Sequence, residues 1–315
     1  MRLDWSDLQV FLAAYRTGSL TGAAKVLKVN PTTVGRRLTA FEQQIGAPLL
    51  LRKDGVYIVS SPGEAVLGHA LQMELHAQLA ENQILGAADK LAGRVRLATT
   101  SDFSSAFLIH HLKPLREAHP EILIELITTD DLVDIERGEA DIAIRFNEAG
   151  LPPPMDTSKT EAHIERIGEI GLSVFASEEY LEENGCPERG DHFAGHSLII
   201  PTSESRYKPP QSWLDGNTGR NKVALYTATL SEMTAATDAG LGIAVLPFFM
   251  VLRYPRLRQI MPPRTLCSRA IWLLVPGAVR RVQRVRVVQD FLSELFERSL
   301  PLLSGHFSPS IIPAR

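Results

Sequence analysis

Cysteine is scarce in this chain of 315 residues, which has only Cys186 and Cys267, far apart in the sequence. Two isolated cysteines cannot form the disulfide framework of a small secreted protein, and their separation does not match a zinc site. A redox switch between them is one interpretation. The spacing favours the other, in which both are buried free thiols in a reducing compartment.

Long apolar runs are also missing. The longest apolar stretch, residues 241–252, is too short to span a bilayer and contains Gly242 and Pro247, so we expect it to be buried core. The first seven residues are acidic and lack the apolar centre of a signal peptide. The sequence therefore predicts a cytoplasmic protein with no membrane partner.

Catalytic motifs are absent as well. Gly240 and Gly242 lack the third glycine of a dinucleotide fingerprint, and the adjacent His110 and His111 cannot hold one metal ion from the same helix face. The nucleophile elbow, the P-loop and the zinc-protease motif do not occur in the sequence. We expect no enzyme, no cofactor and no metal site.

Residues 19–45 contain two short helical patterns joined by a tight connection. Asn30 is a good N-cap, and Pro31 suits the first position of the second helix because its missing N–H costs nothing there. Apolar residues at 34, 38, 41 and 45 share one face of that helix. A helix-turn-helix is the interpretation that this pattern favours, although helix pairs of this kind also occur in proteins that do not bind DNA. The polar face of the second helix would contact bases or phosphates through Thr32, Thr33, Arg36 and Arg37.

A hairpin with a basic tip follows this helix pair. Asp54 and Gly55 lie between two strand-like segments, which is a strong hairpin signal. Arg52 and Lys53 precede the turn and would lie against the DNA backbone or minor groove, as in the wing of a winged helix. Residues 1–60 carry eight lysines and arginines against four acids, a net charge of +4, whereas the whole chain has −3. A basic head on an acidic body is typical of a nucleic-acid-binding protein with a separate second module.

The chain resembles the LysR-type transcriptional regulators. The matching segments are residues 7–11, 18–24, 33–38, 45–50 and 61–63, together with Glu42 and Arg52. The family often has glutamine or a similar polar residue where Pro31 stands and usually serine where Gly35 stands, so the DNA contacts from these two positions are open. A glycine inside a helix costs about 1 kcal/mol relative to alanine, and close approach of the backbone to DNA is the only reason that the sequence offers for it.

A long helix should begin at the capping box of Ser61 and Glu64, with Pro62 at its first position, and end at Gly93. Leucines follow at intervals of four, at positions 67, 71, 75 and 79. Such a stripe either packs onto its own domain or pairs with a second helix. The resemblance implies the second arrangement, an antiparallel linker-helix dimer that matches a two-fold DNA site.

Strand and helix patterns alternate after residue 94, which predicts crossover connections and a largely parallel sheet. We expect strands at 95–100, 122–127, 140–145, 172–176, 197–200, 222–226 and 242–247, and helices at 103–118, 132–137, 178–183 and 231–239. Segments near 160–168 and 266–275 would cross between two lobes. The local sequences 138–145 and 239–247 also match the LysR family, which implies a two-lobed α/β effector domain like that of periplasmic binding proteins.

These observations predict a multidomain chain: a winged helix-turn-helix at 1–60, a linker helix at 61–93, an effector domain at 94–300 and a loose tail at 301–315. Lobe I would comprise about 94–163 and 270–300, and lobe II about 164–269. Ligands of α/β sheets lie beyond the carboxyl ends of the strands. The residues at such ends are Thr99, Thr100, Ser101, Thr128, Thr129, Arg145, Phe146, Pro201, Thr202, Thr229 and Ser231.

Each hydroxyl in this set is equally explained as a helix cap, and Arg145 as half of a structural salt bridge. Their convergence favours a small polar effector that carries a carboxylate. The sequence thus predicts a transcriptional regulator that binds double-stranded promoter DNA, self-associates as a dimer or tetramer and senses a small molecule, with RNA polymerase as a further partner. The alternatives are a solute-binding or transport-associated protein with an appended helical head, and a DNA-binding protein with a degenerate sensor.

Overall fold

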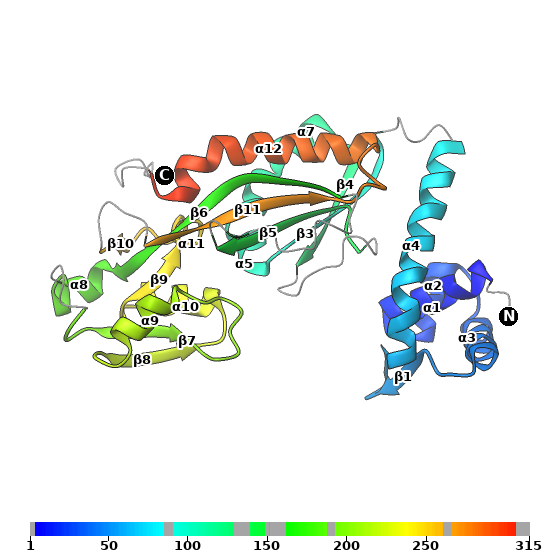
Figure 1. The fold of residues 1–315 in the computed structure, drawn as a ribbon, viewed down its shortest axis with the longest axis horizontal. Helices are drawn as coiled ribbons and strands as arrows, with labels where there is room; N and C mark the ends of the chain where they lie inside the picture. The colour runs from blue at the N-terminus through cyan, green and yellow to red at the C-terminus, as the bar shows by residue number, and fades with distance from the viewer. Residues whose placement is uncertain are drawn as a thin grey trace. The chain divides into compact units, whose positions relative to one another are not determined.

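The computed structural model describes residues 4–84, 91–128, 139–148, 151, 162–187, 193–260 and 266–306 (Figure 1). Its contacts divide the chain into two compact units. The first, called the head, lies within residues 1–90, and the second, called the body, comprises most of the chain from Leu91 onward. In the described residues, no helix combines the length and the apolar character needed to cross a membrane.

The head begins with the helices α1 (Trp5–Thr17), α2 (Leu20–Leu27) and α3 (Pro31–Ile45). The Ser19 hydroxyl caps α2 by accepting a hydrogen bond of 3.0 Å from the Gly22 N–H. Pro31 occupies the first turn of α3, as the sequence predicted, and Gly46 ends this helix in the left-handed conformation. Asn30 has the extended N-cap conformation, but its side chain forms no capping hydrogen bond.

The expected hairpin consists of β1 (Leu50–Lys53) and β2 (Val56–Val59), which pair in antiparallel register. Asp54 and Gly55 both have positive φ, 50° and 85°, as a type I′ turn requires. The Glu42 carboxylate accepts hydrogen bonds from the Leu49 and Leu50 N–H groups, at 2.7 and 3.1 Å. The start of β1 is therefore tied to α3.

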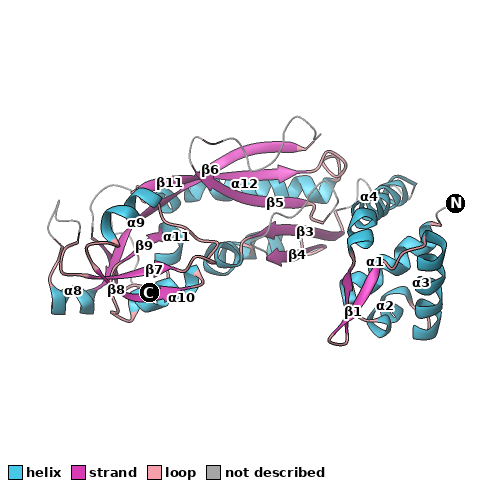
Figure 2. Cartoon of the chain, turned by 60° about the horizontal axis from the view of Figure 1, so that its bottom comes forward, coloured by secondary structure: helices cyan, strands magenta, loops and turns pink. Residues whose placement is uncertain are grey.

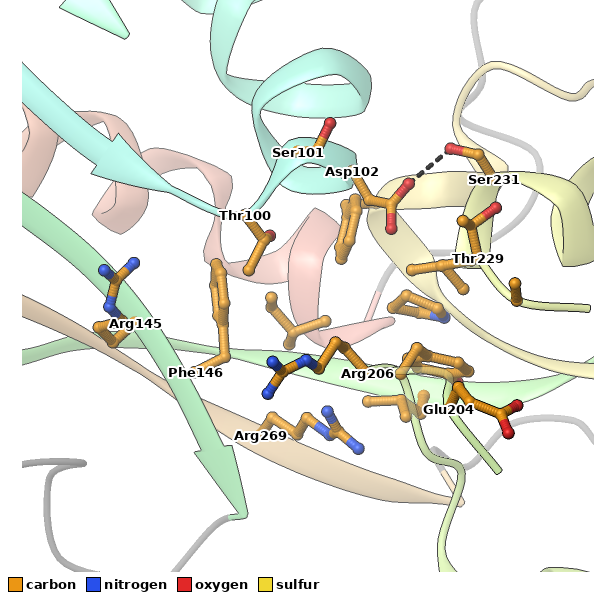
Figure 3. A pocket seen from close by; sticks show the side chains of 17 residues that line it. Thr100, Ser101, Asp102, Arg145, Phe146, Glu204, Arg206, Thr229, Ser231 and Arg269 are labelled. Carbon is orange, nitrogen blue, oxygen red and sulfur yellow. Dashed lines mark hydrogen bonds between the residues drawn. The ribbon is translucent and has the colours of Figure 1, made fainter. Parts of the chain in front are cut away.

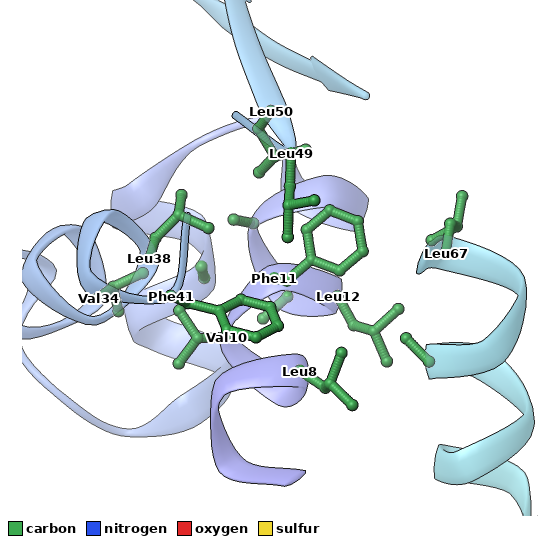
Figure 4. Close-up of a cluster of buried hydrophobic side chains, with 14 of the residues drawn as sticks. Leu8, Val10, Phe11, Leu12, Val34, Leu38, Phe41, Leu49, Leu50 and Leu67 are labelled. Carbon is green, nitrogen blue, oxygen red and sulfur yellow. The ribbon is translucent and has the colours of Figure 1, made fainter. Parts of the chain in front are cut away.

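A single apolar core joins all parts of the head (Figure 4). Phe11 of α1 and Phe41 of α3 lie at its centre, each 1% exposed or less. Gly35 faces α2, because a Cβ at this position would lie 3.2 Å from Leu20 Cδ1. Packing against Leu20 therefore leaves little room for a side chain at Gly35, an observation that the sequence alone did not supply.

The long helix α4 (Ser61–Ile84) departs from the sequence prediction at both ends. Its cap is Ser60, whose hydroxyl accepts from the Gly63 N–H at 3.0 Å, so the capping box at Ser61 was wrong. Gly93 does not end the helix but is the first residue of β3. Leu67 and Leu71 are buried in the core of the head itself, whereas the side chains of residues 75 and 79 lie outside the described set.

The body is built on a sheet of seven described strands in the order β10-β6-β11-β5-β3-β4, with β9 paired to β6 (Figures 1 and 2). Their bounds are β3 (Gly93–Thr99), β4 (Ile122–Thr128), β5 (Ile142–Glu148), β6 (His163–Ser177), β9 (Ala244–Pro247), β10 (Leu257–Gln259) and β11 (Cys267–Val275). Among the described strands of this sheet, the parallel pairs are β3 with β4 and β3 with β5. The expectation of a largely parallel sheet was wrong, because the long crossing strands β6 and β11 are antiparallel to each other and to their other neighbours.

A smaller parallel pair, β7 (Ser197–Pro201) and β8 (Lys222–Thr227), forms the second part of the body. The helices that accompany these strands are α8 (Glu178–Asn184), α9 (Gln211–Asn217), α10 (Leu230–Asp238) and α11 (Phe248–Val251). The predicted helix at 103–118 is divided into α5 (Ser101–Phe103), a π-helix (Ser104–Leu108), α6 (Ile109–His111) and α7 (Lys113–Ala118). The helix predicted at 132–137 lies outside the described residues.

The last helix, α12 (Gln283–Ser304), continues through Pro301 into the segment that the sequence predicted as a loose tail. Leu303 is fully buried, and a Cβ on Gly305 would lie 2.1 Å from the Phe248 ring. The end of α12 is therefore packed onto the body. Cys186 and Cys267 are free thiols, as predicted, but Cys186 is exposed and Cys267 is half-buried, so the expectation that both are buried was wrong.

Candidate functional site

The first candidate site is the N-terminal half of α3. Thr32 and Arg36 are exposed there, and Thr33 is half-buried. Among the described residues, Arg36 has no hydrogen bond or ion pair, so its guanidinium is available to a ligand in solvent. Val34 and Leu38 are buried on the other side of the helix, which fixes the direction in which Arg36 points.

Arg37 has a different environment from Arg36. Its Nη2 and Nε donate to Asp7 Oδ1 at 2.9 and 3.2 Å, and Nη2 also donates to the Ser6 hydroxyl. These bonds join α3 to the first turn of α1. The structure therefore gives Arg37 a partner inside the head.

The hairpin tip is the second exposed basic segment of the head. Arg52 and Lys53 are both exposed at the end of β1. The hairpin is held at its other strand, where the Tyr57 N–H donates to the Gly18 carbonyl at 2.8 Å. Gly18 itself has a positive φ of 60°, and a Cβ there would lie 2.8 Å from Val56. The base of the hairpin is thus attached to the end of α1, and the exposed tip projects from it.

The body contains a cleft of about 530 Å³ (Figure 3). Its walls come from the start of α5 and the residue before it, from β5, β6 and β11, from the loop before α9, and from the first turns of α10 and α11 with the residues that precede them. The lining residues are Thr100, Ser101, Asp102, Arg145, Phe146, Ile170, Leu172, Glu204, Arg206, Tyr207, Ala228, Thr229, Leu230, Ser231, Pro247, Phe249 and Arg269.

Six of the residues predicted to bind an effector line this cleft: Thr100, Ser101, Arg145, Phe146, Thr229 and Ser231. Thr99 is fully buried at the end of β3 and does not line it. Thr128, exposed at the end of β4, and Pro201 and Thr202, at the end of β7, lie outside the lining as well. Thr129 lies outside the described residues.

The sequence prediction missed most of the charged lining. Asp102 directly follows Ser101, so the rule that ligands lie beyond the carboxyl ends of strands could have predicted it. Arg269 lies on the crossing strand β11, and Arg206 and Tyr207 lie in the loop after β7. No periodic pattern or motif marks these three positions, because two of them lie in a loop and Arg269 lies near the start of β11 and not at its carboxyl end.

The hydroxyls of the cleft are not equivalent. Thr229 belongs to a capping box of α10, in which its hydroxyl accepts from the Glu232 N–H at 3.1 Å and Glu232 accepts in return from the Thr229 N–H. Ser231 instead donates to Asp102 Oδ1 at 2.5 Å, a bond between residues 129 positions apart. Thr229 is therefore explained as a cap, while Ser231 connects two walls of the cleft (Figure 3).

The basic residues of the cleft also differ. Arg145 is 7% exposed, its Nη2 has no hydrogen-bond partner among the described residues, and burial lowers the pKa of its guanidinium. It lies beyond the Phe146 ring, away from the side chains of Arg206 and Arg269 (Figure 3). Arg269 donates to the Lys208 carbonyl, and its guanidinium carbon lies 5.6 Å from the centre of the Tyr207 ring. The salt bridge proposed for Arg145 does not occur among the described residues.

Two further groups complete the electrostatics of the cleft. Burial raises the pKa of Tyr207, whose hydroxyl donates to the Val245 carbonyl at 2.9 Å. Glu204 is exposed and points away from the centre of the cleft. Hydrogen bonds to its carboxyl, first from its own backbone N–H and then from the Ser203 side chain, lower the pKa of this group. Groups of three or more metal-binding side chains do not occur in the described parts of either unit.

Comparison with known proteins gives a family match for each of the two units. Residues 5–64 match the family model of the bacterial regulatory helix-turn-helix protein, lysR family, and residues 88–297 match the LysR substrate binding domain. The Mau operon transcriptional activator of Paracoccus denitrificans is 29% identical over 298 residues, which cover 95% of this chain and 98% of the activator.

Solved structures show the same fold. A full-length OxyR variant from Pseudomonas aeruginosa has a TM-score of 0.71 at 15% identity, with 93% of this chain and 95% of OxyR covered. Full-length CbnR, solved in complex with its target DNA, has a TM-score of 0.58 at 19% identity, over 94% of this chain and 100% of CbnR. The relatives are regulators and not transporters, which contradicts the solute-binding alternative. The second family model covers well over half of the chain, and the chain therefore belongs to the LysR family of DNA-binding transcriptional regulators with a substrate-binding domain.

Proposed function

We propose that this regulator recognises its DNA site through the exposed half of α3 and the hairpin tip. Arg36, Thr32 and Thr33 contact base edges or phosphates, and Arg52 and Lys53 contact the backbone or minor groove. The observation that carries the proposal is the contrast between the two neighbouring arginines, since Arg36 is exposed while Arg37 is bonded to Asp7. Arg37 positions the helix.

Binding to labelled DNA from the region upstream of the protein's own gene tests this proposal. Arg36→Ala should weaken specific binding by about 1–3 kcal/mol if Arg36 contacts a base. Arg52→Ala should instead weaken specific and competitor DNA alike and reduce the salt dependence. Arg220→Ala, which removes an exposed charge from the body, is the matched control. Equal binding of a scrambled competitor, together with no effect of Arg36→Ala, would refute base recognition by α3 at that site.

We propose further that the cleft of the body binds a small effector that carries an acidic group. Arg206 and Arg269 supply permanent positive charge beside apolar walls that include Phe146 and Phe249. A reporter driven by the target promoter, in cells grown on different carbon and nitrogen sources, should respond to one source in the wild type. The Arg269→Ala variant should lose that response while its DNA binding stays normal. An unchanged response in this variant would contradict the assignment of the cleft.

Self-association through α4 is the third part of the proposal. A dimer would present two heads to a two-fold DNA site. Light scattering at several protein concentrations should give a mass of two or four chains, and a monomer at all concentrations would exclude the proposed dimer.

A further inference from the structure

The residue before α3 is an asparagine whose side chain does not cap the helix. Asn30 has the extended backbone of an N-cap, but its amide group forms no hydrogen bond with any described residue of the head. Its carbonyl accepts instead from the Thr33 and Val34 N–H groups, at 2.9 and 3.2 Å. An N-cap asparagine ordinarily uses its side-chain oxygen for one of the first N–H groups of the helix. The amide of Asn30 therefore has no structural role among the described residues of the head.

Asn30 lies at the end of α3 that meets the bases in a helix-turn-helix, because the N-terminal residues of the second helix contact base edges. It is exposed, as is Arg36 later in the same helix. Pro31, which follows Asn30, has no N–H and no polar side-chain atom. Asn30 is therefore the first side chain at this end of α3 that can form hydrogen bonds with a base.

The neighbours of Asn30 in the chain carry positive charge and an exposed apolar side chain. Lys25, Lys28 and Arg36 are all exposed, and Val29, directly before Asn30, is 43% exposed. The charges favour the phosphates that border a groove. Inside the major groove, the apolar group that a valine can contact is the 5-methyl group of thymine.

An amide side chain distinguishes adenine from guanine in the major groove. Its oxygen accepts from the N6 amino group of adenine while its nitrogen donates to N7, which gives a bidentate pair. Guanine presents two acceptors, N7 and O6, so the amide oxygen would face another acceptor. The thymine of an A·T pair adds its methyl group to the same groove, which suits an apolar neighbour of the amide.

We infer that Asn30 selects an adenine in the target DNA, with Val29 against the methyl group of a thymine beside it. This inference rests on the proposed recognition of DNA through α3. It goes further, because neither residue is among the contacts proposed above, and because it names the base pair that the start of the helix selects.

Selection of bound sequences from a random DNA pool tests the inference on the full-length protein. The wild type should select a motif with an A·T pair that Asn30→Ala selects no longer, while the rest of the motif stays the same. Replacing this pair with G·C should weaken wild-type binding about five- to 150-fold and leave binding of the variant unchanged. Gln43→Ala removes an exposed amide from the last turn of α3 and is the matched control, which should select the wild-type motif.

Base analogues in the selected site identify the atoms that are recognised. 7-Deazaadenine lacks the N7 acceptor, so it should weaken binding of the wild type but not of Asn30→Ala. Deoxyuridine in place of the neighbouring thymine lacks the methyl group, and should weaken binding of the wild type but not of Val29→Ala.

A second substitution separates recognition from capping. Asn30→Ser keeps a residue that caps helices well but loses the bidentate amide, so it should select the same motif as Asn30→Ala. Amide hydrogen exchange of the α3 peptides should be no faster in Asn30→Ala than in the wild type, because the side chain forms no cap. Faster exchange in Asn30→Ala that Asn30→Ser reverses, with the wild-type motif retained, would overturn the inference and identify Asn30 as a cap.

Two further results would overturn the inference. One is the same A·T preference in Asn30→Ala as in the wild type, and the other is an equal loss of binding to every sequence, which indicates a phosphate contact. If Arg36→Ala erases a base preference and Asn30→Ala does not, α3 still recognises DNA and only the role of Asn30 is wrong. A wild type that selects no motif would refute both.

Discussion

Substitutions of the two neighbouring arginines of α3 should have different effects: loss of Arg37 should destabilise the head, and loss of Arg36 should weaken DNA recognition. Arg37 donates from two nitrogens to Asp7 Oδ1, at 2.9 and 3.2 Å, and the two side chains are 35% and 23% exposed. A charged hydrogen bond inside a protein is worth about 1.5–3 kcal/mol, and a fully exposed ion pair about 0.2–1 kcal/mol. Because this pair is partly exposed, we expect a coupling free energy of about 1 kcal/mol.

A double-mutant cycle of Asp7→Ala and Arg37→Ala measures this coupling. Amide hydrogen exchange of the α1 and α3 peptides in the full-length protein reports the local opening free energy of the head without a two-state unfolding assumption for the whole chain. Arg36→Ala should leave that free energy unchanged and lose specific DNA binding. The reasoning is refuted if Arg36→Ala destabilises the head as much as Arg37→Ala, or if the cycle gives no coupling.

Other contacts give further expectations. Gly63→Ala should destabilise the head by about 1–3 kcal/mol or more, measured by amide exchange, because its Cβ would lie 2.1 Å from the Leu49 carbonyl oxygen; an unchanged head would contradict this. Ser60→Ala should cost about 1 kcal/mol as a lost cap, with faster exchange confined to the first turn of α4, and faster exchange throughout α4 would count against it. Tyr207 has a raised pKa, so its burial stabilises the body fully below the ordinary tyrosine value of about 10 and less as the pH rises above it. When the pH is raised from below this value to above it, the urea midpoint of unfolding should therefore fall further in the wild type than in Tyr207→Phe. An equal fall in both proteins would show that Tyr207 is not the cause.

The head could be predicted from the sequence because its signals are local. The positions 34, 38 and 41 are buried on one face of α3 as the spacing indicated, and the Asp-Gly turn has the two positive φ values that a tight hairpin needs. The predicted N-cap of the long helix was wrong, because a contact with another segment of the head decides which serine caps it. Ser60 rather than Ser61 caps α4. Its hydroxyl accepts from the Gly63 N–H and donates to the Pro48 carbonyl at 2.6 Å, so a residue outside the helix helps to position the cap.

The cleft could be predicted only in part, because its residues come from many elements. The strand-end rule located Thr100 and Ser101, which follow β3, and Phe146, which lies two residues before the end of β5. It failed for Thr128, since β4 is at the edge of the sheet and its end lies away from the cleft. Arg269 enters the cleft from β11, a crossing segment that the sequence predicted without its antiparallel pairing to β6, and Arg206 and Tyr207 enter it from the loop after β7.

Three of the residues shared with the LysR family have a structural role in the head of this chain. Glu42 holds the start of β1, Gly18 accepts a hydrogen bond from β2, and Gly63 allows α4 to approach the Leu49 carbonyl, so these residues build the winged head. None of these contacts depends on which DNA sequence is bound. The positions that differ from the family pattern, Pro31 and Gly35, lie on α3 beside the proposed DNA-contacting residues. These three shared residues therefore specify the architecture of the head, while the choice of target sequence is expected from the exposed side chains of α3, with Arg36 foremost among them.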